Sequence, residues 1–174
     1  MGYDVSRQET VLFGGYRFGV PLGDTWVWNS TSWEPRTPVV SPTARYFHAM
    51  AYDTVRHELL LFGGTAATAV TEPSFDDTWG WDGTNWIRHS PAQSPPPRNG
   101  HGLAFDEAWG EAVLFGGCQS TEHFHCPLLN DTWVWDGGNW SRRLPATAPP
   151  PEDRLWIGIR RFAATSDPIR RFGH

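Results

Sequence analysis

The chain has 174 residues and a formal net charge of −5, with eleven Trp, ten Phe, eighteen Gly and fifteen Pro against two Met. Its length suits one ordinary domain, and aromatic residues punctuated by Gly and Pro indicate many short strands joined by turns. The arginines are scattered along an acidic chain, which argues against nucleic acid as a partner. No apolar stretch is long enough for a membrane helix.

A three-fold internal repeat runs along the chain. Each copy has an apolar run that ends in two glycines, then Asp-Thr-Trp, then a second Trp two residues later and a third five residues further on. The di-glycine runs lie at 11–15, 60–64 and 113–117, and the Asp-Thr-Trp triplets lie at 24–26, 77–79 and 131–133. The period is about 53 residues, which is typical of a repeat architecture.

Each copy contains the patterns of four strands. In the second copy we expect a strand from His48 to Asp53, a strand ending on residues 61–64, a strand over residues 77–81 and a short strand at Trp86. The third of these alternates with a period of two, as a strand does, and Asp-Gly turns precede the fourth in two copies. A Pro-rich connection that cannot pair in a sheet then leads to the next unit. Four strands at this spacing make one propeller blade.

The di-glycine run, the Asp-Thr-Trp-x-Trp segment and the last Trp together resemble the Kelch motif, over residues 1 to about 142. The Trp-rich form is similar to bacterial Kelch arrays, and the fold it implies is that of the central domain of galactose oxidase. The resemblance implies an all-β, Kelch-type β-propeller with about three four-stranded antiparallel blades, as an incomplete propeller in an open arc or as half of a closed assembly.

The repeat also divides the chain. Residues 1–44 are a partial first blade, 45–97 a second repeat, 98–153 a third, and 154–174 the degenerate start of a fourth repeat or a disordered tail. Propellers typically close with about four to eight blades. We therefore expect missing blades, or a second copy of the chain as a homodimer, to complete the ring.

Residues that recur in every copy are expected to serve packing between neighbouring blades. This interpretation covers the nine aligned Trp. It also covers Arg45 with His48 and Arg98 with His101, which we expect to make hydrogen bonds between blades. The Asp of each Asp-Thr-Trp, at 24, 77 and 131, is expected to hold loop backbone in an Asx turn.

The copies differ most between the di-glycine and Asp-Thr-Trp, at residues 16–23, 65–76 and 118–130. Because insertions in repeat folds map to loops on one face, we expect these loops to line one rim and to bind the ligand. The candidate ligand-binding residues are Tyr16, Arg17, Phe18, Phe75, His123 and Phe124.

The expected function is that of a non-catalytic binding or scaffold module with a protein partner. The alternatives are a carbohydrate-binding propeller and a fragment of a galactose-oxidase-like enzyme. A copper radical site similar to that of galactose oxidase needs two Tyr and two His, whereas all four Tyr of this chain lie in its first third. We expect no catalytic residue, cofactor or metal ion.

The third variable loop holds both cysteines, Cys118 and Cys126, together with His123 and His125. A local disulfide would staple this loop in an exported protein, and two free thiols are the second interpretation. A zinc site is the third, although the spacing is not a familiar zinc pattern. The sequence leaves the compartment open, and a disulfide would indicate a secreted or cell-surface protein.

Overall fold

The computed structural model describes residues 1–66, 74–119 and 127–151, which form twelve strands and no helix. The first sheet contains β1 (Gly2–Asp4), β2 (Glu9–Arg17), β3 (Val20–Trp28) and β4 (Trp33–Arg36). The second contains β5 (Ala49–Asp53), β6 (Glu58–Phe62), β7 (Thr78–Trp81) and β8 (Trp86–His89). The third contains β9 (Gly102–Asp106), β10 (Glu111–Cys118), β11 (Leu128–Trp135) and β12 (Trp140–Arg143). Three four-stranded antiparallel sheets confirm the all-β class and the four-stranded unit.

Each sheet is a meander in which strands pair in chain order. Acidic side chains close its turns. After the first strand of the second sheet, the Asp53 carboxylate accepts the Val55 and Arg56 N–H groups at 2.9 and 2.8 Å. Before its last strand, the Asp82 carboxylate accepts the Asn85 N–H at 2.7 Å. Such Asx turns let tight connections keep their backbone groups paired, so the sheet follows directly from the local sequence.

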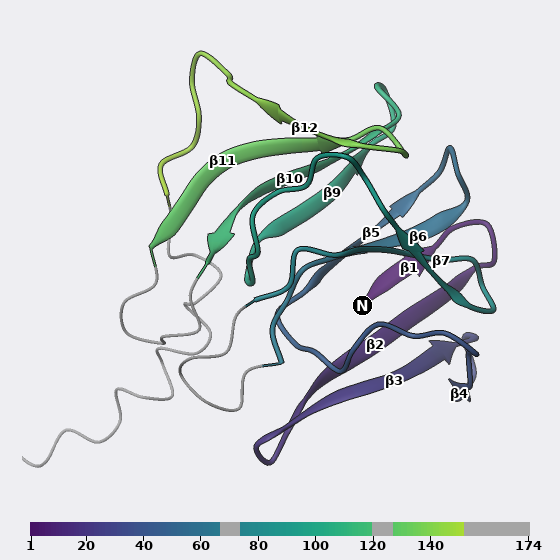
Figure 1. The fold of residues 1–174 in the computed structure, drawn as a ribbon. Helices are drawn as coiled ribbons and strands as arrows, with labels where there is room; N and C mark the ends of the chain where they lie inside the picture. The colour runs from purple at the N-terminus through teal and green to yellow at the C-terminus, as the bar shows by residue number, and fades with distance from the viewer. Residues whose placement is uncertain (67–73, 120–126, 152–174) are drawn as a thin grey trace, which may run out of the picture.

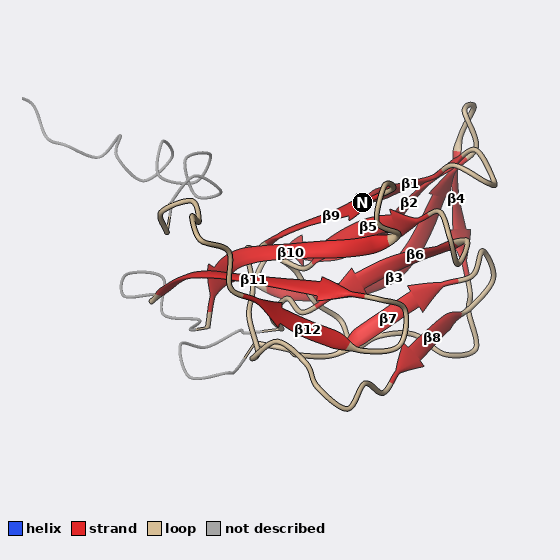
Figure 2. Ribbon diagram, turned by 90° about the horizontal axis from the view of Figure 1, so that it is seen from above, coloured by secondary structure: helices blue, strands red, loops and turns tan. Residues whose placement is uncertain are grey.

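The three sheets stand side by side, each with its first strand next to the first strand of its neighbour. Strand β1 lies against β5 and β6, and β5 lies against β9 and β10 (Figure 1). Viewed from above, β12 and β8 lie at the opposite edge from β1 and β9 (Figure 2). Residues 154–174, expected as a degenerate repeat or tail, lie outside the described residues.

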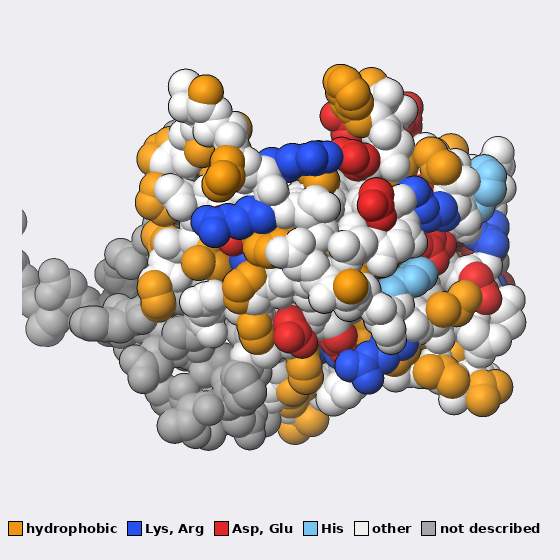
Figure 3. All heavy atoms as spheres, turned by 45° about the horizontal axis from the view of Figure 1, so that its top comes forward, with side chains coloured by type: hydrophobic (Ala, Val, Ile, Leu, Met, Phe, Trp, Pro, Cys, Tyr) orange, Lys and Arg blue, Asp and Glu red, His pale blue; other side chains and the backbone are white. Residues whose placement is uncertain are grey.

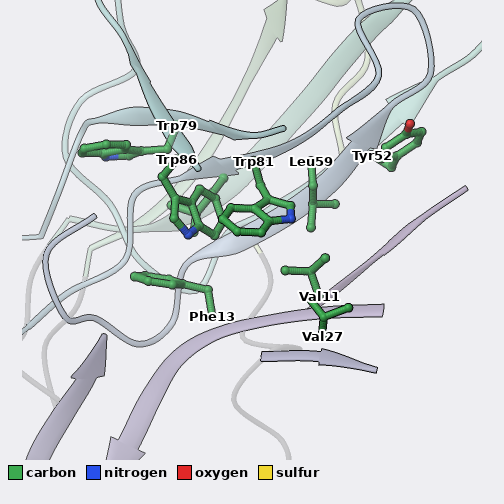
Figure 4. Close-up of a cluster of buried hydrophobic side chains, with 9 residues drawn as sticks. Val11, Phe13, Val27, Tyr52, Leu59, Trp79, Trp81 and Trp86 are labelled. Atoms are coloured by element: carbon green, nitrogen blue, oxygen red, sulfur yellow. The ribbon is translucent and has the colours of Figure 1, made fainter. Parts of the chain in front are cut away.

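Two hydrophobic clusters fill the spaces between the sheets. The first joins Val11 and Phe13 of the first sheet to Leu59 and Leu61 of the second (Figure 4). The second joins residues on the opposite face of β6 to the third sheet, and its members are Leu60, Phe62, Ala112, Leu114, Trp133, Trp135 and Trp140. Alternate side chains of β6 therefore point to opposite neighbours, which explains why all five residues of this strand are buried.

The aligned Trp of the second and third sheets are packing residues, as the repeat predicts. Trp86 is 1% exposed, meets the Phe13 ring edge-on at 5.0 Å, and donates its indole N–H to the Thr25 hydroxyl at 3.0 Å. Trp140 repeats this contact one sheet later, with Phe62 at 5.1 Å and the Thr78 hydroxyl at 2.9 Å. Each sheet is thus held to the one before it by the same aromatic and polar contacts.

The di-glycines are needed where neighbouring sheets approach most closely. Gly63 has φ +62°, and a Cβ added there would lie 2.6 Å from the Arg98 carbonyl oxygen. The next residue, Gly64, donates its N–H to that same oxygen at 2.9 Å. Only a residue without a Cβ fits both the left-handed conformation and this approach, so the di-glycine serves the packing of neighbouring sheets.

The described residues contain no helix that is long and apolar enough to cross a membrane. On the face seen in Figure 3, hydrophobic side chains are interspersed with acidic and basic ones.

Candidate functional site

The connections between the second and third strands leave the same end of each sheet as the connections that enter the next sheet. The backbone shows this directly, because Tyr46 at the entry to the second sheet exchanges two 2.9 Å hydrogen bonds with Thr65 beyond β6. Likewise, Gly15 of β2 donates to the Arg45 carbonyl at 2.9 Å. The side chains of both connections therefore meet at one rim.

A cluster of inclined aromatic rings forms at this rim from residues of the first and second repeats. The Tyr16 ring on β2 lies 4.8 Å from the Tyr46 ring, and Tyr46 in turn meets Phe47 at 4.8 Å between centroids. Tyr16 is 52% exposed, so the cluster reaches solvent. We call the five residues Tyr16, Arg17, Phe18, Tyr46 and Phe47 the aromatic rim.

The tip of the β2–β3 hairpin extends the aromatic rim. Phe18 and Gly19 both have positive φ, +48° and +87°, as the two central residues of a type I′ turn require. The turn holds the Phe18 ring in solvent at 90% exposure. The Arg17 guanidinium lies 5.2 Å from the centre of that ring, within the range of a cation–π contact.

Phe47 of the aromatic rim has a backbone conformation that is unfavourable for its side chain. Its φ is +57°, in the left-handed region that is costly for a bulky side chain. The matching residue of the third repeat is Gly100, with φ +64°, and its N–H donates to the Phe47 carbonyl at 2.8 Å. The backbone at this position therefore suits glycine. A strained aromatic residue in its place, facing other aromatics at a surface, is the kind of outlier that indicates function.

The other sequence-predicted site residues divide into two groups. Phe75 is partly buried, and the Arg45 guanidinium lies 4.1 Å from its ring centre, so the Phe75 ring covers a buried ion pair. His123 and Phe124 lie outside the described residues. Of the six predicted residues, the structure brings Tyr16, Arg17 and Phe18 to the aromatic rim.

Sequence reasoning missed Tyr46 and Phe47 as site residues, because both lie in the segment that was aligned as a repeated Arg-x-x-His motif. A signal was present. Residues 45–48 are Arg-Tyr-Phe-His, and the aligned residues 98–101 are Arg-Asn-Gly-His. Two aromatic residues in the second repeat therefore correspond to a polar residue and a glycine in the third. A difference between copies of a repeat is the same kind of evidence that identified the variable loops as candidate binding segments.

A buried ion pair recurs beneath the rim. The Arg45 guanidinium, 0% exposed, binds both Asp77 carboxylate oxygens at 2.5 and 2.8 Å and the Gly63 carbonyl at 3.0 Å. The Trp79 indole N–H completes the set with a 2.7 Å bond to Asp77. Burial alone would raise the pKa of Asp77, but the bonds and charge of Arg45 outweigh it and hold that pKa below 3.8.

This arrangement corrects two expectations. The Arg45 side chain binds within its own repeat, whereas it is the Arg45 backbone that bonds to the first sheet. The Asp77 side chain holds Arg45 and Trp79, and the Asx turns fall instead on Asp53 and its counterparts. Arg98 and Asp131 repeat the same bidentate pair at 2.7 and 2.9 Å. Because the pair recurs, it is a structural feature of the repeat.

Of the two histidines in the repeated motif, His101 is buried and His48 is partly buried, and both are uncharged at neutral pH. Burial, assisted by nearby positive charge, lowers the pKa of His48 to about 3. Burial does the same for His101, again to about 3, with the Arg98 charge as the second cause. Among the described residues, no three His, Cys, Asp or Glu side chains lie together as metal ligands would.

Cys118 is buried at the end of β10, 2% exposed, and its backbone exchanges 2.9 Å hydrogen bonds with Asn99 in both directions. Cys126 lies outside the described residues, so the Cys118–Cys126 disulfide stays a prediction.

A scan against protein-family models matches no family, and a search of curated proteins finds no relative. The assignment of the aromatic rim as a candidate site therefore rests on the geometry of this chain alone.

Proposed function

We propose that the chain is a Kelch-type propeller module that binds a protein partner, without catalysis, through the aromatic rim. Three consecutive four-stranded meanders with the same junction between them support the propeller assignment. The Kelch assignment rests on the repeated di-glycine and Asp-Thr-Trp segments.

The observation that carries the binding role is the left-handed conformation of Phe47, whose ring is linked through Tyr46 to the exposed Tyr16. The matching position of the third repeat is occupied by Gly100 with a similar φ, so the backbone of the repeat does not require an aromatic side chain here. Aromatic residues and Arg are the types most enriched at protein–protein binding hot spots. The ionisable groups with the most displaced pKa values, His48 and His101, are in contrast partly or fully buried and occupy repeated positions. This is expected of packing residues and supports binding over catalysis.

A carbohydrate is the second candidate ligand. The half-exposed Tyr16 ring and the 90% exposed Phe18 ring offer apolar faces with polar neighbours, and such faces suit the stacking of sugar rings.

Two probes separate these candidates: a random peptide library displayed on phage and a glycan array. Peptide ligands would support the protein-binding role, and glycan ligands the second candidate. The decisive comparison uses Phe47→Gly and Tyr16→Ala against Val39→Ala, whose side chain is 93% exposed in a connection between sheets. We expect the two rim variants to lose binding by about tenfold or more, with the Val39 variant unchanged. Ligands that bind both rim variants as well as the original chain would contradict the proposal.

Phe47→Gly also separates function from folding. Glycine relieves the left-handed strain, so this variant should fold at least as stably as the original chain. A loss of binding in a protein of equal or higher melting temperature cannot be attributed to damage of the fold.

A further inference from the structure

The two junctions between sheets are copies of one interface with two unlike sides. The side on the earlier of the two sheets, called the trailing side, presents an apolar pair from the second strand and the Thr of Asp-Thr-Trp. At the first junction these residues are Val11, Phe13 and Thr25. The leading side, on the following sheet, presents three Trp, which are Trp79, Trp81 and Trp86 at the first junction and Trp133, Trp135 and Trp140 at the second. Each sheet thus carries one side of each kind.

Among residues 1–66, 74–119 and 127–151, none packs on the trailing side of the third sheet as the following sheet does at the first two. Its residues are Val113, Phe115 and Thr132, and all three are partly exposed. At the two occupied junctions the equivalent residues are buried: Val11 and Leu60 are both 0% exposed, Phe13 and Phe62 are 2% and 0%, and Thr25 and Thr78 are both 1%. The third sheet therefore presents an open acceptor for a Trp-bearing side.

The leading side of the first sheet is open in the complementary way. Trp33 is 43% exposed, whereas its counterparts Trp86 and Trp140 are 1% and 0% exposed. Trp26 and Trp28 are likewise partly exposed, although their counterparts in the other two sheets are buried. These three Trp form a large apolar face that no other sheet of the described residues covers.

From these two open faces we infer that the third sheet of one chain packs on the first sheet of a second copy, so that two chains close a ring of six sheets. The occupant is specified by the interface itself, because the chain carries both halves of a junction that it already forms twice. Phe115 would take the place of Phe13 and Phe62, and the Thr132 hydroxyl would accept the Trp33 indole N–H of the other copy. A contact between unlike faces makes a closed assembly when the rotation closes, and six blades lie within the usual range of about four to eight.

Trp109 supports a contact at this edge. The first two sheets have an Arg at this turn position, and each reaches the next sheet: Arg7 donates to the His57 carbonyl and Arg56 to the Gly110 carbonyl, both at 3.3 Å. In the third sheet the position is Trp109, 80% exposed. A large apolar side chain in that place costs solubility unless another surface covers it.

The test is the mass of the full chain in solution, by sedimentation across the micromolar range. We expect a species of two chains, twice 19.6 kDa. Phe115→Glu and Trp33→Glu should each give the mass of one chain, because each places a charge in an apolar junction. Val39→Glu, with its side chain 93% exposed elsewhere, is the matched control and should leave the dimer intact.

Mixing the two disrupted variants tests the pairing of unlike faces. A chain with Phe115→Glu keeps its leading side and one with Trp33→Glu keeps its trailing side, so an equimolar mixture should recover a two-chain species that neither forms alone. Thr132→Val keeps the shape of the trailing side and removes one hydrogen-bond acceptor. This variant covers the case in which a glutamate prevents folding, and it should weaken the dimer by about tenfold, because the lost bond occurs at both junctions.

Three results would overturn the inference. A single-chain mass throughout the micromolar range would mean that no second copy binds. Assemblies that grow beyond two chains with concentration would mean that the ring does not close at six sheets. A Phe115→Glu or Trp33→Glu protein that remains dimeric would place the contact elsewhere.

Discussion

His101 lies between the second and third sheets as a buried, uncharged side chain, and we predict that it makes the protein sensitive to acid. It is 4% exposed, with its ring edge-on to Phe62 at 5.5 Å. Neither ring nitrogen has a hydrogen-bond partner of normal geometry among the described residues. Burial, reinforced by the Arg98 charge, lowers its pKa from 6.5 to about 3, and the nearby Phe62 carbonyl opposes this only weakly.

The loss of stability follows from proton uptake by the unfolded chain. Below pH 6.5 the unfolded histidine binds a proton, whereas folded His101 stays neutral down to a pH of about 3. The unfolded state binds more protons throughout this window, so the free energy of unfolding falls as the pH falls. From about pH 7 to about pH 5 one such histidine costs about 2 kcal/mol, since each pKa unit is worth about 1.4 kcal/mol. His48, whose pKa is also lowered to about 3, adds a loss of the same sign.

Urea unfolding of the original chain and of His101→Leu, each at neutral and at mildly acidic pH, measures this effect. Leucine does not titrate, so the drop in unfolding free energy between about pH 7 and pH 5 should be smaller by about 2 kcal/mol in the variant. Comparing the two drops removes any direct effect of the substitution on packing. Phe62→Leu alters the same junction without removing a titrating group, and it should retain the full pH dependence.

The result that would refute this reasoning is an equal pH dependence in the original chain and in His101→Leu. The two Arg–Asp ion pairs do not contribute to the loss of stability between about pH 7 and pH 5. Arg45 and Arg98 hold the pKa values of Asp77 and Asp131 below 3.8 against the opposing effect of burial, so the stabilisation from these carboxylates is lost only at lower pH.

Three further predictions concern stability and are measured by urea unfolding at neutral pH. Trp86→Phe should cost about 3 kcal/mol through lost packing and a lost hydrogen bond, whereas Ala at the neighbouring Ile87, 47% exposed, should cost less than about 1 kcal/mol. Arg98→Met should cost about 3–5 kcal/mol by leaving Asp131 unpaired, and Asp131→Leu in the same chain should recover much of that loss. Gly63→Ala should cost about 2 kcal/mol or more, because φ is +62° and the Arg98 carbonyl blocks the added methyl.

The sheets could be predicted from the sequence because their determinants are local and occur three times. Strand alternation, Asp-Gly turns and di-glycines each act over a few residues. The structure agrees with the expected strand from His48 to Asp53 to within one residue, since β5 begins at Ala49. The expected packing role of the Trp also holds for the second and third sheets, where a neighbour is present to cover them.

Side-chain partners were harder to predict, because they depend on how distant segments meet. Arg45 and Asp77 are 32 residues apart, and Arg98 and Asp131 are 33 apart. Both pairs were visible as repeated opposite charges, but periodicity alone could not separate a partner in the same repeat from one in the next. The aromatic rim required the same knowledge, since Tyr16 and Tyr46 come from different sheets.

Comparing Phe47 with Gly100, its counterpart in the third repeat, separates what the backbone requires from what the side chain adds. In a repeated fold, a requirement of the backbone applies to every copy, and Gly100 shows that this backbone position accepts glycine. A phenylalanine there bears the cost of a left-handed conformation, about 1–2 kcal/mol, without filling a core. Its ring instead meets Tyr46 edge-on, in an aromatic cluster that reaches solvent at Tyr16. This cost is the reason that we propose the aromatic rim as the binding surface, apart from the two faces that we expect to close the ring.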